Sequence, residues 1–155
     1  DCEALIVGIR QGIIDVIATD HAPHTPEDKL VEFGDAAVGF TGLETAVGLL
    51  LTLVQQQKLD LVTVVRCLTE KPASLLASKG SGVGRLSPGS SGDITLLNLS
   101  PDWIVDSSKF KSKGKNTPLD GATLTGRVAA TVYEGCVVHD SEDRFVTALK
   151  GALDD

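Results

Sequence analysis

The sequence is poor in several residue types, and these shortages exclude whole classes of protein. It has three cysteines, Cys2, Cys67 and Cys136, which suit neither a disulfide framework nor a zinc-finger spacing and predict a reducing, cytoplasmic setting. Its longest apolar runs, such as 47–54, are too short to cross a bilayer, so we expect no membrane association. The formal net charge of -7 offers no basic stripe for phosphates, which argues against a nucleic-acid partner. There is also no methionine in the 155 residues, from which we expect a fragment of a longer chain.

The first half of the chain has the pattern of an α/β protein. Residues 2–11 carry apolar side chains at helical spacing, and 13–18, "IIDVIA", is β-branched and almost continuously apolar, which is typical of a parallel strand buried on both faces. The residues Thr25-Pro26-Glu27-Asp28 predict the start of a short helix. Further helices are predicted over 42–57, 59–70 and 71–78. The first of these is expected to begin with a capping box formed by Thr41 and Glu44.

The composition changes after residue 79. A Gly- and Ser-rich stretch over 80–93 predicts turns, and 94–99 and 122–140 predict strands, the second range folding into a hairpin at Glu134-Gly135. The polar, basic stretch 107–121 between them is interpreted as a solvated connection. We therefore predict an α/β protein with two domains, 1–79 and 80–155.

Candidate chemistry is concentrated where the predicted strand 13–18 ends. Asp20, His21 and His24 follow it, and in parallel α/β folds catalytic groups lie at the carboxyl ends of strands. The carboxylate could bind a metal or act as a general base, and the imidazoles could bind a metal or an anion. The same residues could equally cap the next helix and satisfy loop amides. The third histidine, His139, is expected to lie far away on the β segment.

The residues also carry a resemblance to a known family. "DVIATDHAPHTPEDK" followed by "VGFTGLETAVGLLLT", then "LTEKPASLLA", "GRLSPGSSGDITLLNL" and "KNTPLDGATLTGRVAATVYEGCVVHD", resembles the carboxyl-terminal third of the dihydroorotases, in the cyclic amidohydrolase superfamily. The resemblance covers nearly the whole chain. It implies the last strand and following helices of a (β/α)8 barrel, together with strands of a small β-sandwich domain.

The resemblance also implies roles for individual residues. Asp20 would bind one metal of a zinc centre, with two ions in the complete enzyme, and would carry a proton to the amide nitrogen as the ring opens. His24 would bind the substrate carboxylate, and His21 would orient the site. The backbone of Val38 and Gly39 would meet the substrate; the family often has proline before this glycine, and a backbone contact survives the change to Val38.

The implied function is a zinc-dependent dihydroorotase, which interconverts N-carbamoyl-L-aspartate and L-dihydroorotate in de novo pyrimidine biosynthesis. The family's other metal ligands lie before this segment, so the chain is expected to hold part of a site and to be inactive alone. Two alternatives stay open: a hydantoinase- or allantoinase-like cyclic amidase, and a non-catalytic dihydroorotase-like scaffold for aspartate transcarbamoylase. Besides the small-molecule substrate, the implied partners are a second copy of the chain or aspartate transcarbamoylase.

Overall fold

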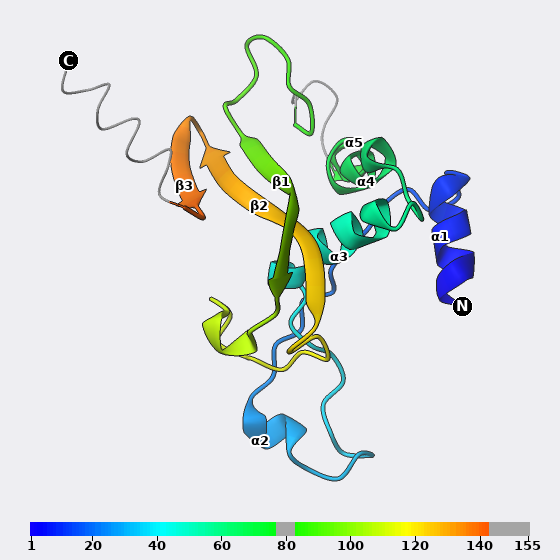
Figure 1. The fold of residues 1–155 in the computed structure, drawn as a ribbon, viewed down its shortest axis with the longest axis vertical. Helices are drawn as coiled ribbons and strands as arrows, with labels where there is room; N and C mark the ends of the chain where they lie inside the picture. The colour runs from blue at the N-terminus through cyan, green and yellow to red at the C-terminus, as the bar shows by residue number, and fades with distance from the viewer. Residues whose placement is uncertain (77–82, 143–155) are drawn as a thin grey trace, which may run out of the picture.

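The computed structural model describes residues 1–76 and 83–142 and has an α/β fold. Figure 1 shows α3 between a group of helices and a three-stranded sheet, with α2 and its loop at one end of the molecule. The elements are α1 Cys2–Arg10, α2 Pro26–Lys29, α3 Leu43–Gln55, α4 Leu61–Leu68, α5 Glu70–Leu76, β1 Ile94–Ile104, the 3-10 turn η1 Ser107–Lys109, β2 Thr123–Tyr133 and β3 Cys136–Asp140. Among the helices of the described residues, none is long and apolar enough to span a bilayer.

The helical part forms where the sequence predicts helices. Its core cluster consists of Ile6 of α1, Leu50 of α3, Val64 of α4, and Leu59 just before α4. Asp60 caps α4, since its Oδ1 accepts a hydrogen bond of 2.8 Å from the Thr63 amide. The predicted end of the helix at 78 and the proposed domain boundary at 79 lie outside the described residues.

The sheet is antiparallel, in the order β1-β2-β3. The predicted hairpin is confirmed: Tyr133 pairs with Cys136, and Glu134 and Gly135 have φ of 48° and 79°, as a two-residue type I′ turn requires. Strand β1 extends to residue 104 instead of the predicted 99. The pairing shifts register between 98 and 102, which accommodates the proline at 101 in a bulge.

The prediction of a strand over 13–18 is wrong. In the part of the chain that the structure describes, these residues have no strand partner, and the Ile17 amide instead donates to the Cys67 carbonyl at 3.2 Å. An apolar, β-branched run becomes a strand only beside a neighbour, and the described strands all pair among themselves. The parallel pairing that does form here is a single bridge between His21 and Phe40.

Helix α3 packs directly on β2 and joins the two halves of the chain. Gly48 allows the close approach, because a Cβ there would lie 2.9 Å from Trp103 Cζ2 and 3.1 Å from Leu124 Cδ1. Thr52 Oγ1 accepts a hydrogen bond of 2.8 Å from the Thr125 amide. A second core cluster of Val105, Phe110 and Leu124 continues from this contact toward the connection that follows β1.

Candidate functional site

Three segments far apart in the sequence meet at the candidate site: 19–24, 38–43 and 110–116. The first two lie side by side, since the Ala22 amide donates to the Phe40 carbonyl at 3.0 Å next to the His21–Phe40 bridge. The third packs against the first, and a Cβ at Gly114 would lie 2.7 Å from Pro23 Cβ. The residues predicted for the site are therefore gathered in one place.

Asp20 lies exposed at the turn between these segments, with a φ of 44°. This left-handed conformation costs free energy for any residue with a Cβ, although aspartate tolerates it better than most. Its carboxylate makes no hydrogen bond or ion pair with any residue that the structure describes. The acid is thus available to a proton, a cation or a substrate.

His24 contacts the segment that the sequence predicts to meet the substrate. Its Nε2 lies 2.8 Å from the Val38 carbonyl oxygen. A carbonyl can only accept, so Nε2 carries the hydrogen, and Nδ1 makes no hydrogen bond within the described ranges. An anion approaching Nδ1 would pair with the imidazolium form, in which both ring nitrogens donate.

Gly39 has a conformation and a position that only glycine fits. Its φ is 109°, and a Cβ would lie 2.6 Å from Ala22 Cβ. Val38 beside it is 89% exposed. The Val38 carbonyl is taken by His24 and the Gly39 carbonyl by side-chain donors, whereas the two amide N–H groups have no acceptor among residues 1–76 and 83–142. This segment therefore offers a ligand two hydrogen-bond donors, the amides of Val38 and Gly39.

His21 caps helix α3. Its Nδ1 lies 3.1 Å from the Gly42 amide and 3.2 Å from the Leu43 amide, and accepts from both. The predicted capping box of Thr41 and Glu44 is wrong, because the Thr41 amide and hydroxyl both donate to the Asn116 carbonyl, at 2.9 Å and 3.1 Å. Glu44 instead accepts from the amides of Lys111 and Ser112, at 2.8 Å and 3.0 Å.

The lysines of the basic stretch 107–121 are exposed, as a solvated surface predicts, but the same stretch also contacts the site, which the sequence did not predict; these lysines are Lys109, Lys111, Lys113 and Lys115. Asn116 reaches both site segments: its Oδ1 accepts from the His24 amide at 3.0 Å, and its Nδ2 donates to the Gly39 carbonyl at 3.1 Å. Sequence reasoning missed this residue. The signal available in the sequence was the glycine at 114 within a polar stretch. In the structure, the backbone at Gly114 lies close to Pro23.

His139 lies closer than the sequence predicts. It lines an open pocket of about 340 Å³ together with His21, Glu44 and Ser112. Ser112 Oγ is 3.5 Å from His21 Nε2. Because His21 Nδ1 accepts from two amides, Nε2 carries the hydrogen and cannot take the Ser112 proton, which excludes an activated serine in this geometry.

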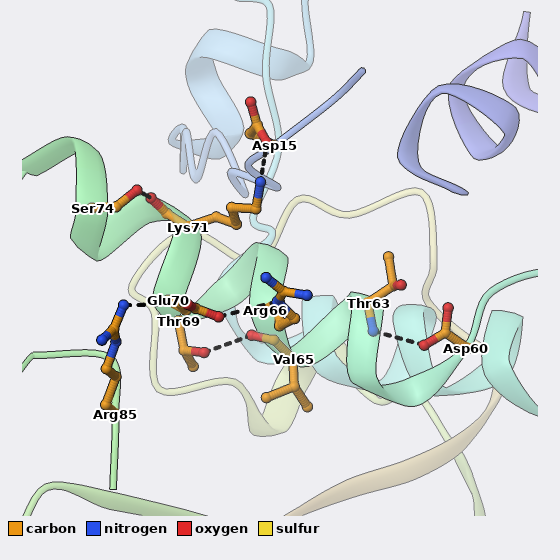
Figure 2. A network of polar contacts seen from close by, with 10 residues as sticks. All are labelled: Asp15, Asp60, Thr63, Val65, Arg66, Thr69, Glu70, Lys71, Ser74 and Arg85. Atoms are coloured by element: carbon orange, nitrogen blue, oxygen red, sulfur yellow. Dashed lines mark hydrogen bonds and ion pairs between the residues drawn. The ribbon is translucent and has the colours of Figure 1, made fainter. Parts of the chain in front are cut away.

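A second pocket of about 270 Å³ lies between α1 and α4, and its cations are already partnered. Figure 2 shows Lys71 paired with Asp15 at 2.6 Å, and Glu70 held by Arg66 at 3.0 Å and by Arg85 at 3.3 Å. Burial raises the pKa of the Cys67 thiol beside them, which disfavours the reactive thiolate. This network ties α5 to 13–18 and has the character of a structural contact.

The described residues do not form a metal site by themselves. No group of three or more histidine, cysteine, aspartate or glutamate side chains that could hold an ion occurs within residues 1–76 and 83–142. His21 accepts through Nδ1 and so presents an N–H at Nε2, which leaves the Asp20 carboxylate and His24 Nδ1 as the candidate ligands of this site that are free among the described residues. A zinc ion needs at least three such ligands.

The chain is similar to known proteins over most of its length. The model of the amidohydrolase family matches residues 1–138. The dihydroorotase of Syntrophus aciditrophicus is 46% identical over 142 residues, which is 92% of this chain and 33% of that protein. The dihydroorotase of Thermoanaerobacter sp. is 46% identical over 87% of this chain and 31% of its own length. The solved L-hydantoinase (dihydropyrimidinase) of Arthrobacter aurescens superposes with a TM-score of 0.81 at 36% identity, over 88% of this chain and 31% of that one.

The fold and the match together define the class: the chain belongs to the amidohydrolase family. It spans about a third of the length of the curated relatives that it matches.

Proposed function

We propose that the chain is part of a dihydroorotase and carries that enzyme's proton-transfer acid and substrate-anion contacts. The observation that carries the proposal is the contact between His24 and Val38, which sets an imidazole beside amide donors that have no acceptor among the described residues. Asp20 belongs to the same site segment as His24, and its carboxylate is likewise without a partner there. The relatives that match over most of the chain bear the name dihydroorotase. As part of the same proposal, 1–79 would complete a (β/α)8 barrel and 80–155 would belong to a small β domain.

The donors of the site suit the substrate. Dihydroorotate has a free carboxylate, and a carboxylate is bound best by charged or backbone N–H donors. His24 offers a ring nitrogen that makes no other contact within the described ranges, and Val38 and Gly39 offer two amides. Charge-assisted hydrogen bonds of this kind contribute about 1.5–3 kcal/mol each.

Asp20 would serve as the acid and base of the reaction. In the hydrolytic direction water adds to the ring carbonyl, the ring C–N bond breaks, and the leaving nitrogen takes up a proton. A carboxylate that receives the proton of the attacking water can deliver it to that nitrogen. Zinc belongs to the proposal only for the complete protein, to which Asp20 would contribute one carboxylate.

A cyclic amidase of the hydantoinase type is the second candidate. The similar L-hydantoinase structure favours it. The two candidates differ in the substrate anion, because simple hydantoins lack the carboxylate that His24 would bind. Relative rates on the two substrates therefore separate them.

The test replaces the matching segment of the Syntrophus aciditrophicus dihydroorotase with this chain. We expect the graft to hydrolyse dihydroorotate, and Asp20→Asn to lower kcat by about a thousandfold or more, in keeping with loss of a central acid–base group. Asp35→Asn, which removes the same charge from the stretch between α1 and α3, should leave kcat unchanged. A folded graft that prefers hydantoin would establish the alternative, and one in which Asp20→Asn is fully active would refute both.

The carboxylate contact has its own test in the same graft. His24→Ala should raise KM for dihydroorotate roughly tenfold to a hundredfold, the value of one charge-assisted hydrogen bond, with a smaller effect on kcat. His139→Ala is the matched control: His139 lies on β3 and lines the open pocket beside His21, but it makes none of the proposed anion contacts. An unchanged KM in His24→Ala would remove His24 from the substrate contacts.

A further inference from the structure

Asn116 makes more contacts to the site than its place in a polar connection suggests. Its side chain joins the two site segments, accepting from the His24 amide at 3.0 Å and donating to the Gly39 carbonyl at 3.1 Å. Its backbone carbonyl accepts from the amide and the hydroxyl of Thr41, at 2.9 Å and 3.1 Å. Side chain and backbone therefore hold the segments by separate contacts.

The carbonyl that Asn116 holds is fixed from a second side. Lys29 Nζ donates to the Gly39 carbonyl at 2.9 Å and to the Ala37 carbonyl at 2.7 Å. A carbonyl oxygen has two lone pairs, so the donors from Lys29 and Asn116 saturate it. Three successive carbonyls are therefore held by side chains. Lys29 holds that of Ala37, His24 holds that of Val38, and Lys29 and Asn116 together hold that of Gly39.

We propose that the Asn116 side chain is a positioning residue, which holds His24 and Gly39 in the arrangement that binds the substrate anion. This inference rests on the proposed function. Asn116 need not touch the substrate: it fixes the backbone of the groups that do. A 0.5 Å displacement of such groups is enough to weaken binding.

The structural part of the proposal is tested on the 155-residue chain by amide hydrogen exchange resolved by residue. In Asn116→Ala the His24 amide loses its acceptor and should exchange about tenfold faster, whereas the Thr41 amide keeps the Asn116 backbone carbonyl and should stay protected. Equal acceleration at both amides would mean that the connection unfolds locally. That result, or an unchanged His24 amide, would overturn the proposal.

The functional part is tested in the graft. Asn116→Asp keeps the size and the Oδ1 acceptor but turns a carboxylate oxygen toward the Gly39 carbonyl. We expect KM for dihydroorotate to rise about tenfold and kcat to stay within about twofold. Asn98→Asp is the matched control: Asn98 accepts from the Ser100 amide on β1, and its variant should keep both constants.

The outcomes separate this inference from the proposed function. An unsubstituted graft that folds but does not hydrolyse dihydroorotate refutes the function, and the exchange experiment still decides whether Asn116 holds His24. A fall in kcat with unchanged KM in Asn116→Asp would assign Asn116 to the chemical step and overturn a positioning role. The double variant with Lys29→Met should raise KM by less than the product of the single effects if both side chains act through the Gly39 carbonyl.

Discussion

Replacing Gly39 by alanine should be among the most damaging single-methyl changes in the chain. The residue has a φ of 109°, which costs a residue with a Cβ about 1–3 kcal/mol. The added methyl would also lie 2.6 Å from Ala22 Cβ and 3.4 Å from the Ala22 carbonyl oxygen. Forcing such a contact apart costs a further ~1–3 kcal/mol. The two terms together predict a loss of about 2–6 kcal/mol.

Gly12→Ala separates the two terms. Gly12 also has a positive φ, 67°, but a Cβ there would meet nothing within 4 Å. Its substitution should therefore cost only the conformational part, about 1–2 kcal/mol. The change in the unfolded chain is the same for both glycines and cancels in the comparison.

The assay is urea unfolding, followed by the fluorescence of the single tryptophan, Trp103. Adding Ala22→Gly to Gly39→Ala removes the opposing methyl and should restore about 1–3 kcal/mol relative to the sum of the single effects. If Gly39→Ala costs no more than Gly12→Ala, or if the double variant shows no coupling, the close approach of the two site segments is not as described.

Three further changes test the supports around the site by the same unfolding measurement. His21→Ala removes the acceptor of two amides at the start of α3 and should cost about 1 kcal/mol; no loss would refute the cap. Hydrogen bonds from the Thr63 side chain and backbone lower the pKa of Asp60. The stabilisation by Asp60 is therefore fully present above the carboxyl pKa of the unfolded chain, and it is lost as the pH falls through the lower pKa of the folded state. We expect Asp60→Ala to cost about 1 kcal/mol at neutral pH and to have no effect in acid. Gly48→Ala would stabilise an ordinary helix by about 1 kcal/mol. Here it should destabilise the protein and shift the Trp103 emission, because the methyl would lie 2.9 Å from the indole. A gain in stability would refute the packing of α3 on the sheet.

Features encoded within a few residues could be predicted from the sequence. The helices over 43–55 and 61–68 follow from apolar spacing, and the hairpin at Glu134-Gly135 follows from turn chemistry, because all of these depend on near neighbours. The run over 13–18 shows the limit. Its composition favours a buried strand, but pairing requires another segment at the right place, and composition does not supply one.

Site contacts were harder to predict because they join distant residues. Thr41 and Glu44 have the spacing of a capping box, yet the Thr41 amide and hydroxyl donate to the Asn116 carbonyl, 75 residues away. The amides of Gly42 and Leu43 donate to His21, about twenty residues earlier. Asn116 lies 92 residues from His24, and no local pattern links the two. The sequence could nominate His24 and Gly39 by resemblance, while the side chain that joins them is visible only after folding.

Asp20 is the member of the site whose presence the fold does not explain. Its φ of 44° is a conformation that glycine would adopt at lower cost. Its carboxylate makes no hydrogen bond or ion pair with the described residues, so it returns no stabilisation there, whereas His21 caps a helix and Asn116 joins two segments. Departures from local preference without a structural gain are characteristic of functional positions. This contrast is the reason to place Asp20, and not His21, at the centre of the proposed chemistry.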